Sequence, residues 1–273
     1  MGFNQQQFEV ARFAVREHLF RRGKCSIAEP CPELPTYLFE TLPSTNQILW
    51  GLIGQGAKAG TVVIAAQQTA GRGQWGRQWQ SSEGGLYLSL ALAPNLQASN
   101  SAQLTLCSAW GIATALRSYD IPVLLKWPND LLLLGHKLGG ILTETRVQQG
   151  QITNAVIGVG INWSNRVPEL GINLQSFCRQ QFKPSVTSLE LLAAIVVEGL
   201  LLGDQHRLEK GIDTILPSYL ELLNSQGCQV MVEGKPGIII GVTPTGELRV
   251  SLSSTPTPSE ICLKPGTISL GYR

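Results

Sequence analysis

Apolar residues recur at helical spacing in several segments of the chain. The spacing predicts helices over about 5–22, from 44 onward, across 106–116, and from 187 to about 202. The segments 44–47 and 187–190 have the spacing of a capping box, in which a side-chain oxygen accepts from a free N–H group of the first turn. We therefore expect a helix to begin at each of these two segments.

Short apolar runs between these segments predict strands in the middle of the chain. They lie at 61–66, 86–92, 123–127 and 155–162, and a hairpin is expected where 131–134 and 138–143 flank Gly135 and His136. Several of these strands are joined by hairpin-length links rather than by helices. We therefore expect an α+β fold with a mixed or antiparallel sheet and helices packed on it.

The pattern changes again toward the C-terminus, where short strands alternate with turn residues at 230–232, 237–242, 247–252 and 261–263. This spacing is typical of a small β-barrel. We therefore expect three regions: an N-terminal helix and proline-containing connector over 1–36, a main domain over 37–225, and a small β domain over 226–273.

Composition narrows the class of protein. A hydrophobic fraction of 43%, a charged fraction of 15% and a net charge of +2 are ordinary for a soluble protein and do not favour nucleic acid or membrane binding. The six cysteines form no CxxC pair, which argues against a zinc site or a disulfide framework. The apolar segment 191–202 is interrupted by Glu198 and is too short to span a bilayer. We expect a cytoplasmic protein.

The densest group of chemically useful residues is Gly-Arg-Gly-Gln-Trp-Gly-Arg-Gln-Trp at 71–79, which follows the predicted strand 61–66. Its three glycines permit tight turns and close approach of backbone N–H groups to an anion, and its two arginines supply forked donors. The segment matches neither a Walker A loop nor a dinucleotide fingerprint. Anion binding is favoured, and a surface loop with solvated arginines is the alternative.

Other candidates are weaker when each is taken alone. Lys126 ends a buried-looking strand and needs a partner, whereas Asn129 and Asp130 after Pro128 either serve a site or satisfy the backbone of a turn. Lys137 beside paired glycines suits a phosphate, although a lysine in a hairpin is usually just exposed.

Two further segments each have two interpretations. The helix start at 44–46 either binds polar ligand groups or only caps the helix. The strand glycines at 158–162 permit close approach by a ligand or by another backbone, and they are equally compatible with tight packing.

Taken in this order, these segments resemble the motifs of the biotin protein ligase family. The resemblance extends over about 37–273, because 266–270 also resembles the terminal small-barrel domain of that family, and it rests on the segments 44–46, 68–79, 85–89, 126–130, 137–140 and 158–162. It implies a catalytic domain like that of class II aminoacyl-tRNA synthetases and of the biotin/lipoate ligase type, followed by an SH3-like barrel.

The resemblance also implies a two-step reaction. Biotin and ATP would form biotinyl-5′-AMP and pyrophosphate, and a lysine of a biotin carboxyl carrier protein, a subunit of acetyl-CoA carboxylase, would then take the biotinyl group. Mg²⁺ is expected on the ATP phosphates, with no protein ligand to the metal. The alternatives are a lipoate or octanoate ligase, which shares the fold type, and a biotin sensor that lacks transfer activity.

The site residues follow from the matching positions. The resemblance implies catalytic roles for Arg72, Lys126, Lys137 and Asp130, the last as a base for the incoming lysine. It implies biotin binding by Ser44, Thr45, Asn46, Gln68, Arg72, Gly73, Gln74, Gly85, Leu86, Lys137 and Gly140, with apolar walls from Leu86, Leu88 and Ile141. It implies ATP or adenylate binding by Gly71, Arg72, Gly73, Gln74, Arg77, Trp79, Asn129, Lys137 and Asn162.

Two positions depart from the family pattern. Gln74 stands where many members have arginine, so we expect the adenylate loop to be held more by its backbone and by Arg72. Thr267 stands where an acidic residue is frequent, which puts a specific contact from the small domain in doubt.

The N-terminal region bears on a second function found in some relatives, which repress genes through a DNA-binding domain. About 36 residues precede the main domain, too few for a helix-turn-helix module with a wing. We expect a mono-functional enzyme that does not bind DNA, as a monomer or a homodimer. A solvated helix face is expected for the basic residues Arg12, Arg16, Arg21, Arg22 and Lys24.

Overall fold

The computed structural model describes residues 2–25, 33–182, 185–252 and 259–271. Its largest element is an eight-stranded sheet with the order β1-β2-β3-β8-β7-β6-β5, in which β4 pairs with β8 beside this path. β1 and β2 run parallel, and the other pairs are antiparallel. The strands are β1 (Thr36–Leu42), β2 (Val62–Gln68), β3 (Leu86–Leu92), β4 (Leu96–Gln97), β5 (Val123–Lys126), β6 (Asp130–Leu133), β7 (His136–Gln148) and β8 (Gln151–Ile161).

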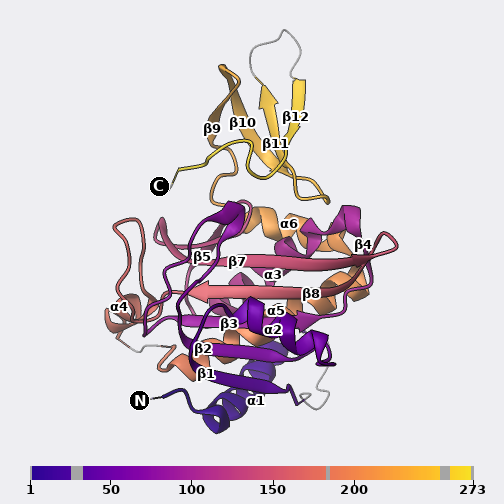
Figure 1. The fold of residues 1–273 in the computed structure, drawn as a ribbon. Coiled ribbons are helices and arrows are strands. Elements are labelled where there is room, and N and C mark those ends of the chain that lie inside the picture. The colour runs from indigo at the N-terminus through magenta and orange to yellow at the C-terminus, as the bar shows by residue number, and fades with distance from the viewer. Residues whose placement is uncertain (1, 26–32, 183–184, 253–258, 272–273) are drawn as a thin grey trace.

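Helices cover the two faces of this sheet unequally. Most of them lie behind the sheet in Figure 1, and α2 (Thr45–Gly54) lies alone in front of β2, β3 and β8. The helices behind are α1 (Gln5–Arg21), α3 (Ala102–Ser118), α5 (Leu189–Lys210) and α6 (Ile212–Leu222), and α4 (Leu174–Arg179) lies at one end of the sheet.

Alternation along the strands assigns side chains to the two faces. In β3, Leu86, Leu88 and Leu90 are fully buried in the main core, whereas Ser89 points to the other face and contacts α2. No helix in the described ranges is long and apolar enough to cross a membrane.

A second sheet of four antiparallel strands, in the order β12-β11-β10-β9, follows α6 and fits an SH3-like domain. Its strands are β9 (Gln229–Val232), β10 (Lys235–Val242), β11 (Leu248–Leu252) and β12 (Ser259–Leu263). The indole N–H of Trp127 donates to the carbonyl of Gly246 at 2.9 Å and ties this sheet to the main one. The expected domain boundaries at 36 and 225 stay predictions.

Most predicted helices and strands are confirmed, with differences at their ends. Ser44 precedes α2, but its side chain makes no capping bond, and α5 is capped by Ser188 rather than Thr187. α5 also continues to Lys210, well beyond the predicted end near 202, and Gly211 follows it with a φ of 77°. The sequence prediction lacked β1, β4, α4 and α6, and the expected connector prolines Pro30 and Pro32 lie outside the described residues.

The basic face expected on α1 is wrong for Arg12. Its side chain is fully buried and donates to Glu198 of α5 at 3.0 Å and to Glu9 at 3.1 Å. Glu198, which interrupts the apolar run of α5, is itself buried at 3% exposure. The two charges satisfy each other between the helices, which is how buried charges are tolerated.

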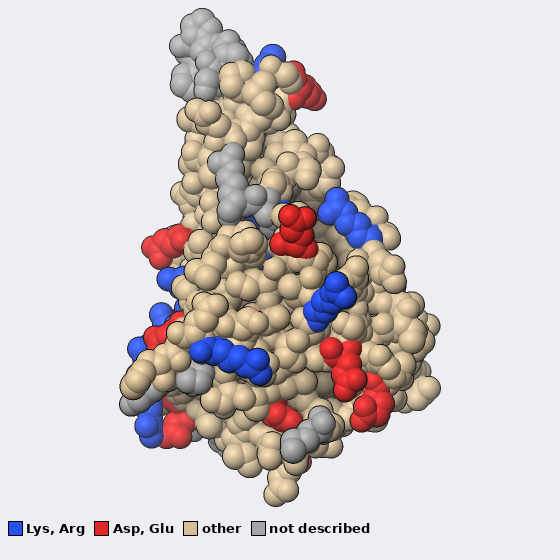
Figure 2. Space-filling model, turned by 90° about the vertical axis from the view of Figure 1, so that its left-hand side faces the viewer, with Lys and Arg blue, Asp and Glu red and all other residues tan. Residues whose placement is uncertain are grey.

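Figure 2 shows one side of the molecule by charge. Lysine and arginine side chains lie scattered among aspartate and glutamate side chains on this side, and neither sign forms a continuous patch. The distribution agrees with the net charge of +2.

Glycines allow α3 and α5 to pack closely. A Cβ atom on Gly111 would overlap the carbonyl oxygen of Gly199, and one on Gly203 would overlap that of Cys107. The two helix backbones therefore touch at these positions, and neither site has room for a methyl group.

We expect Gly111→Ala to lower the free energy of unfolding by about 1–3 kcal/mol, because the added methyl separates the two helices. Gly51 in α2 is the matched control, since nothing lies within 4 Å of a Cβ atom there. Gly51→Ala is expected to raise stability by up to about 1 kcal/mol through helix propensity. Urea denaturation of both variants measures the difference, and equal effects would contradict this account of the packing.

Burial raises the pKa of Cys107 in α3 to about 12, against an ordinary value of 9.0, and the nearby Arg207 opposes part of this shift. The folded protein therefore keeps this proton at pH values where the unfolded chain has lost it. The stabilisation is complete below about pH 9 and is lost as the pH rises toward about 12.

We therefore expect the stability advantage of the wild type over Cys107→Ala to shrink above about pH 9, by up to about 1.4 kcal/mol per pH unit. Urea denaturation at several alkaline pH values measures it. Ser108 is a buried neighbour of Cys107 that does not titrate in this range, so Ser108→Ala is the control and should show a difference that does not change with pH. A constant difference for Cys107→Ala as well would refute this linkage.

Candidate functional site

A cavity of about 960 Å³ lies on the α2 face of the main sheet. This volume is within the usual range of about 300–1,000 Å³ for small-molecule sites. Strands β5 to β8 form its floor, and its walls come from the start of α2, the loop 71–79 and the C-terminal segment 265–271. Parts of the chain that are far apart in sequence therefore meet at one site.

Neutral polar groups line the end of the cavity beside α2. Ser44, Thr45 and Asn46 are buried there at 2–4% exposure. The backbone N–H of Thr45 donates to Oε1 of Gln68 at 2.9 Å, and the amide of Gln68 donates to Ser81 at 2.8 Å. Because Ser44 makes no capping bond, its hydroxyl stays available to the cavity.

The floor is open because glycines stand on this face of β7 and β8. A Cβ atom on Gly158 would overlap Oδ1 of Asn46, and one on Gly160 would overlap the indole nitrogen of Trp79. Gly140, opposite Gly160, also lies next to Trp79, within 3.5 Å of where a Cβ atom would stand. The groups that approach these strand glycines are therefore side chains of the protein itself.

The loop 71–79 is a small hairpin. Gly73 donates to the carbonyl of Arg77 at 2.7 Å, and Arg77 donates to that of Gln74 at 3.1 Å. Trp75 and Gly76 at its tip have φ of 60° and 71°, as in the turns that close two-residue hairpins. The N–H groups of Gly73 and Arg77 are thus used within the loop, and its arginine side chains carry the positive charge instead.

Cations gather at the other end of the cavity. Nζ of Lys137 lies 2.6 Å from Oδ1 of Asp130 and 5.2 Å from the centre of a Trp79 ring. Burial lowers the pKa of Lys126, a shift that Asp130 opposes and that the nearby Lys137 and Arg77 increase. Clustered cations of this kind favour a carboxylate or phosphate in the cavity.

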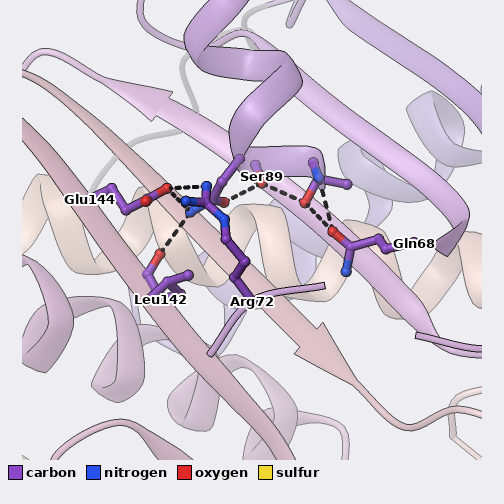
Figure 3. A network of polar contacts seen from close by, with 7 residues as sticks. Gln68, Arg72, Ser89, Leu142 and Glu144 are labelled. Atoms are coloured by element: carbon purple, nitrogen blue, oxygen red, sulfur yellow. Dashed lines mark hydrogen bonds and ion pairs between the residues drawn. The ribbon is translucent and has the colours of Figure 1, made fainter. Parts of the chain in front are cut away.

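Arg72 connects the loop to the floor. Its Nη2 donates to Oε2 of Glu144 at 3.0 Å, and the amide of Asn46 donates to the same oxygen at 2.7 Å (Figure 3). On the side of Asn46 away from Glu144, Ser89 donates to Oδ1 of Asn46 at 2.6 Å. Sequence reasoning gave no role to Glu144 or Ser89. Alternation along β7 could have identified Glu144, because it places Glu144 on the same face as the expected site residue Gly140.

The C-terminal segment 265–271 also lines the cavity, a contribution that sequence reasoning did not assign to it. Gly266 lies against Trp75, since a Cβ atom there would stand 3.2 Å from Cζ2 of the indole. Thr267 donates to the carbonyl of Lys264 at 2.7 Å, within its own segment. The small sheet thus brings its last residues to the loop 71–79.

Most of the expected site residues come together at this cavity. Those that line it are Ser44, Thr45, Asn46, Gln68, Arg72, Gly73, Gln74, Arg77, Trp79, Lys126, Asn129, Asp130, Lys137 and Gly140. Among the described residues, no group of three or more His, Cys, Asp or Glu side chains is placed to hold a metal ion.

Gly71, Gly85, Leu86 and Asn162 do not line the cavity. Leu86 is fully buried on the opposite face of the sheet, and Gly85 leaves room for the hydroxyl of Tyr87. Leu88 also belongs to the main core and does not line the cavity, so the apolar walls expected from Leu86 and Leu88 are wrong, whereas Ile141 belongs to the core and also lines the cavity. The reason is alternation, since ligand-facing and core-facing residues exchange at every step along a strand.

Asn162 and Asn129 hold other parts of the site in place. The amide of Asn162 donates to the backbone carbonyl of Lys137 at 3.4 Å, and that of Asn129 donates to the carbonyl of Ile141 at 2.8 Å. Both side chains therefore fix β7, the strand that carries Lys137.

Comparison with known proteins agrees with this architecture. The chain is 38% identical over 170 residues to the bifunctional ligase/repressor BirA of Bacillus spizizenii, covering 62% of this chain and 52% of that protein. It is 34% identical over 122 residues to the biotin–[acetyl-CoA-carboxylase] ligase of Paracoccus denitrificans, covering 44% of this chain and 50% of that protein. The matches thus span about half the length of these curated relatives.

A solved structure shares the fold over most of the chain. The biotin protein ligase from Aquifex aeolicus in complex with biotin and ATP superposes with a TM-score of 0.70 and 25% identity, covering 88% of this chain and 99% of that one. Residues 38–162 match the model of the biotin/lipoate A/B protein ligase family, and these residues include the loop 71–79 and the strands of the cavity floor. Residues 38–162 therefore form a domain of the biotin/lipoate A/B protein ligase family.

Proposed function

We propose that the chain is an ATP-dependent biotin protein ligase, which forms biotinyl-5′-AMP and transfers the biotinyl group to a lysine of a biotin carboxyl carrier protein. The observation that carries the proposal is the polarity of the cavity. Neutral polar groups line the end beside α2, and Lys126, Lys137 and Arg77 gather at the end formed by β5 to β7. Biotin has the matching polarity, with an uncharged ureido ring at one end and a carboxylate at the other.

In the first step, an oxygen of the biotin carboxylate attacks the α-phosphorus of ATP, and pyrophosphate leaves with the electrons of the broken P–O bond. Negative charge builds up on the α-phosphate as the new bond forms. Lys137 lines the cavity and supplies positive charge to this group, and Arg72 has to leave Glu144 to do the same. Removal of one such donor typically costs on the order of 10²–10³ in rate.

In the second step, the amine of the carrier lysine attacks the carbonyl carbon of the mixed anhydride, and AMP leaves. The amine must lose a proton, and we propose the carboxylate of Asp130 as its acceptor. Asp130 lines the cavity and lies 2.6 Å from Lys137, so Lys137 has to release it for this purpose. The Paracoccus relative, whose name specifies acetyl-CoA carboxylase, supports the carboxylase carrier as the acceptor protein.

Mg²⁺ is proposed to enter with the ATP phosphates. The described residues offer no group of three ligating side chains for a divalent cation, and Asp130 is already paired with Lys137. Mg²⁺ that enters in this way would be held mainly by the ATP phosphates and water.

We expect purified protein to add a biotinyl group to a biotin carrier domain only when Mg-ATP is present, with the intact mass of the carrier as the readout. Lys137→Ala should reduce the rate about 10²-fold or more, because the charge beside the α-phosphate is lost. Lys58 is exposed, away from the cavity, and Lys58→Ala is the matched control with an unchanged rate.

Lipoate supplied in place of biotin separates the alternatives. A lipoyl adduct without a biotinyl one would mean that the acid has been misidentified. Tight biotin binding with no adduct on the carrier would instead make the protein a biotin sensor.

A further inference from the structure

Two parts of the cavity wall come from distant parts of the chain and meet each other. The loop 71–79 follows β2 of the main sheet, and the segment 265–271 follows β12 of the small sheet. They touch where the indole of Trp75 lies against Gly266. Both residues line the cavity, so this contact is part of the boundary between the site and the solvent.

The turn that carries Gly266 fixes its position. The N–H of Thr267 donates to the carbonyl of Lys264 at 3.2 Å, which closes a four-residue turn with Pro265 second and Gly266 third. Gly266 has a φ of 94°. Proline in the second place and a positive φ in the third are the marks of a type II turn, in which the third place favours glycine. The turn therefore places a residue without a side chain at its corner.

The indole of Trp75 occupies the space that a side chain at Gly266 would need. A Cβ atom on Gly266 would stand 3.2 to 3.4 Å from three neighbouring atoms of the six-membered ring of Trp75. Trp75 itself has a φ of 60°, which a bulky residue rarely adopts and which persists only with support from its surroundings. The glycine of the small domain thus gives the tip of the loop a surface on which to rest.

The small sheet is fixed to the main domain at more than one point. Besides the hydrogen bond from Trp127 to Gly246, a Cβ atom on Gly246 would overlap the Cβ atom of Ala102 at the start of α3. The N–H of Asn224, between α6 and β9, donates to the carbonyl of Leu125 in β5 at 2.8 Å. The segment 265–271 is therefore attached to a sheet that has little freedom to move away.

The loop 71–79 is held less firmly than the small sheet. The hydrogen bonds of Gly73 and Arg77 stay within the loop. The ion pair between Arg72 and Glu144 joins side chains that are 45% and 27% exposed, and such pairs contribute little. Since the indole of Trp75 is still 65% exposed, its contact with the small domain is also limited and can open and close.

We infer that Trp75 and Gly266 are positioning residues, which hold the loop 71–79 against the small domain and so slow the release of the activated intermediate. The inference rests on the proposed function, in which that intermediate is biotinyl-5′-AMP. The contact closes one boundary of the cavity while the intermediate waits for the carrier lysine. It opens when the loop moves away from the segment 265–271.

The experiment forms biotinyl-5′-AMP on the protein from isotope-labelled biotin and Mg-ATP without a carrier, adds excess unlabelled biotin, and follows the labelled intermediate that stays bound. Trp75→Ala should release it about three- to tenfold faster, as expected for the loss of one partly exposed apolar contact. Gly266→Ala should have a similar effect, because the methyl group displaces the indole and alanine disfavours the turn. Trp75→Phe keeps an aromatic ring, so its release rate should lie between those of the wild type and Trp75→Ala.

A matched glycine controls for backbone strain in the small sheet. Gly234, between β9 and β10, has a φ of 77°, and nothing lies within 4 Å of a Cβ atom there. Gly234→Ala imposes the same kind of strain as Gly266→Ala but touches no loop, and it should leave the release rate unchanged. Thermal unfolding confirms that each variant is folded at the assay temperature.

The double variant tests whether the two residues act through each other. If they do, Trp75→Ala combined with Gly266→Ala releases the intermediate no faster than the faster single variant. Fold-changes that multiply would mean that each residue acts on the intermediate separately, and they would overturn the inference.

The wild type separates this inference from the proposed function. A wild type that retains biotinyl-5′-AMP, with an unchanged release rate in Trp75→Ala or Gly266→Ala, would overturn the inference and leave the proposed function standing. A wild type that forms no biotinyl-5′-AMP would overturn the proposed function, and this inference with it.

Discussion

The site depends on three glycines that stand on one face of β7 and β8. Gly140, Gly158 and Gly160 stand where the sheet passes under the cavity, and a methyl group at Gly158 or Gly160 would overlap Asn46 or Trp79. On the opposite face the same strands carry apolar residues such as Val159 and Ile161, which belong to the main core. One pair of strands thus supplies both the open floor of the site and the apolar support beneath it.

Charge is concentrated on this floor at a cost in stability. Lys126 has 9% of its surface exposed, and burial lowers its pKa, which means that the folded protein disfavours its charged form. Asp130 relieves part of this penalty, and Lys137 lies against both Asp130 and Trp79. An anionic ligand would compensate the remaining positive charge, so the site is built for a partner with negative charge.

Local sequence patterns predict helices and strands, but they do not show which residues from distant parts of the chain meet. Alternation and turn residues predicted the strands and the hairpin, where Leu134 and Gly135 both take positive φ. The pattern did not show that Leu86 and the cavity lie on opposite faces, because the face of a strand depends on its neighbours. It also did not show that Arg12 would be buried, because its partner Glu198 lies on a helix that is far away in the sequence. The family motifs identified most of the residues that line the cavity. The contributions of Glu144, Ser89 and the C-terminal segment could be recognised only from the three-dimensional structure.

The central claim is that one cavity joins biotin to the adenylate of ATP. The most direct measurement mixes the protein in excess with biotin and Mg-ATP, without any carrier, and follows pyrophosphate release and the bound product by mass spectrometry. The account predicts one biotinyl-5′-AMP per biotin supplied, retained by the protein, with an equal amount of pyrophosphate released. Pyrophosphate release that does not depend on biotin, or a chain that binds both compounds and joins neither, would contradict it.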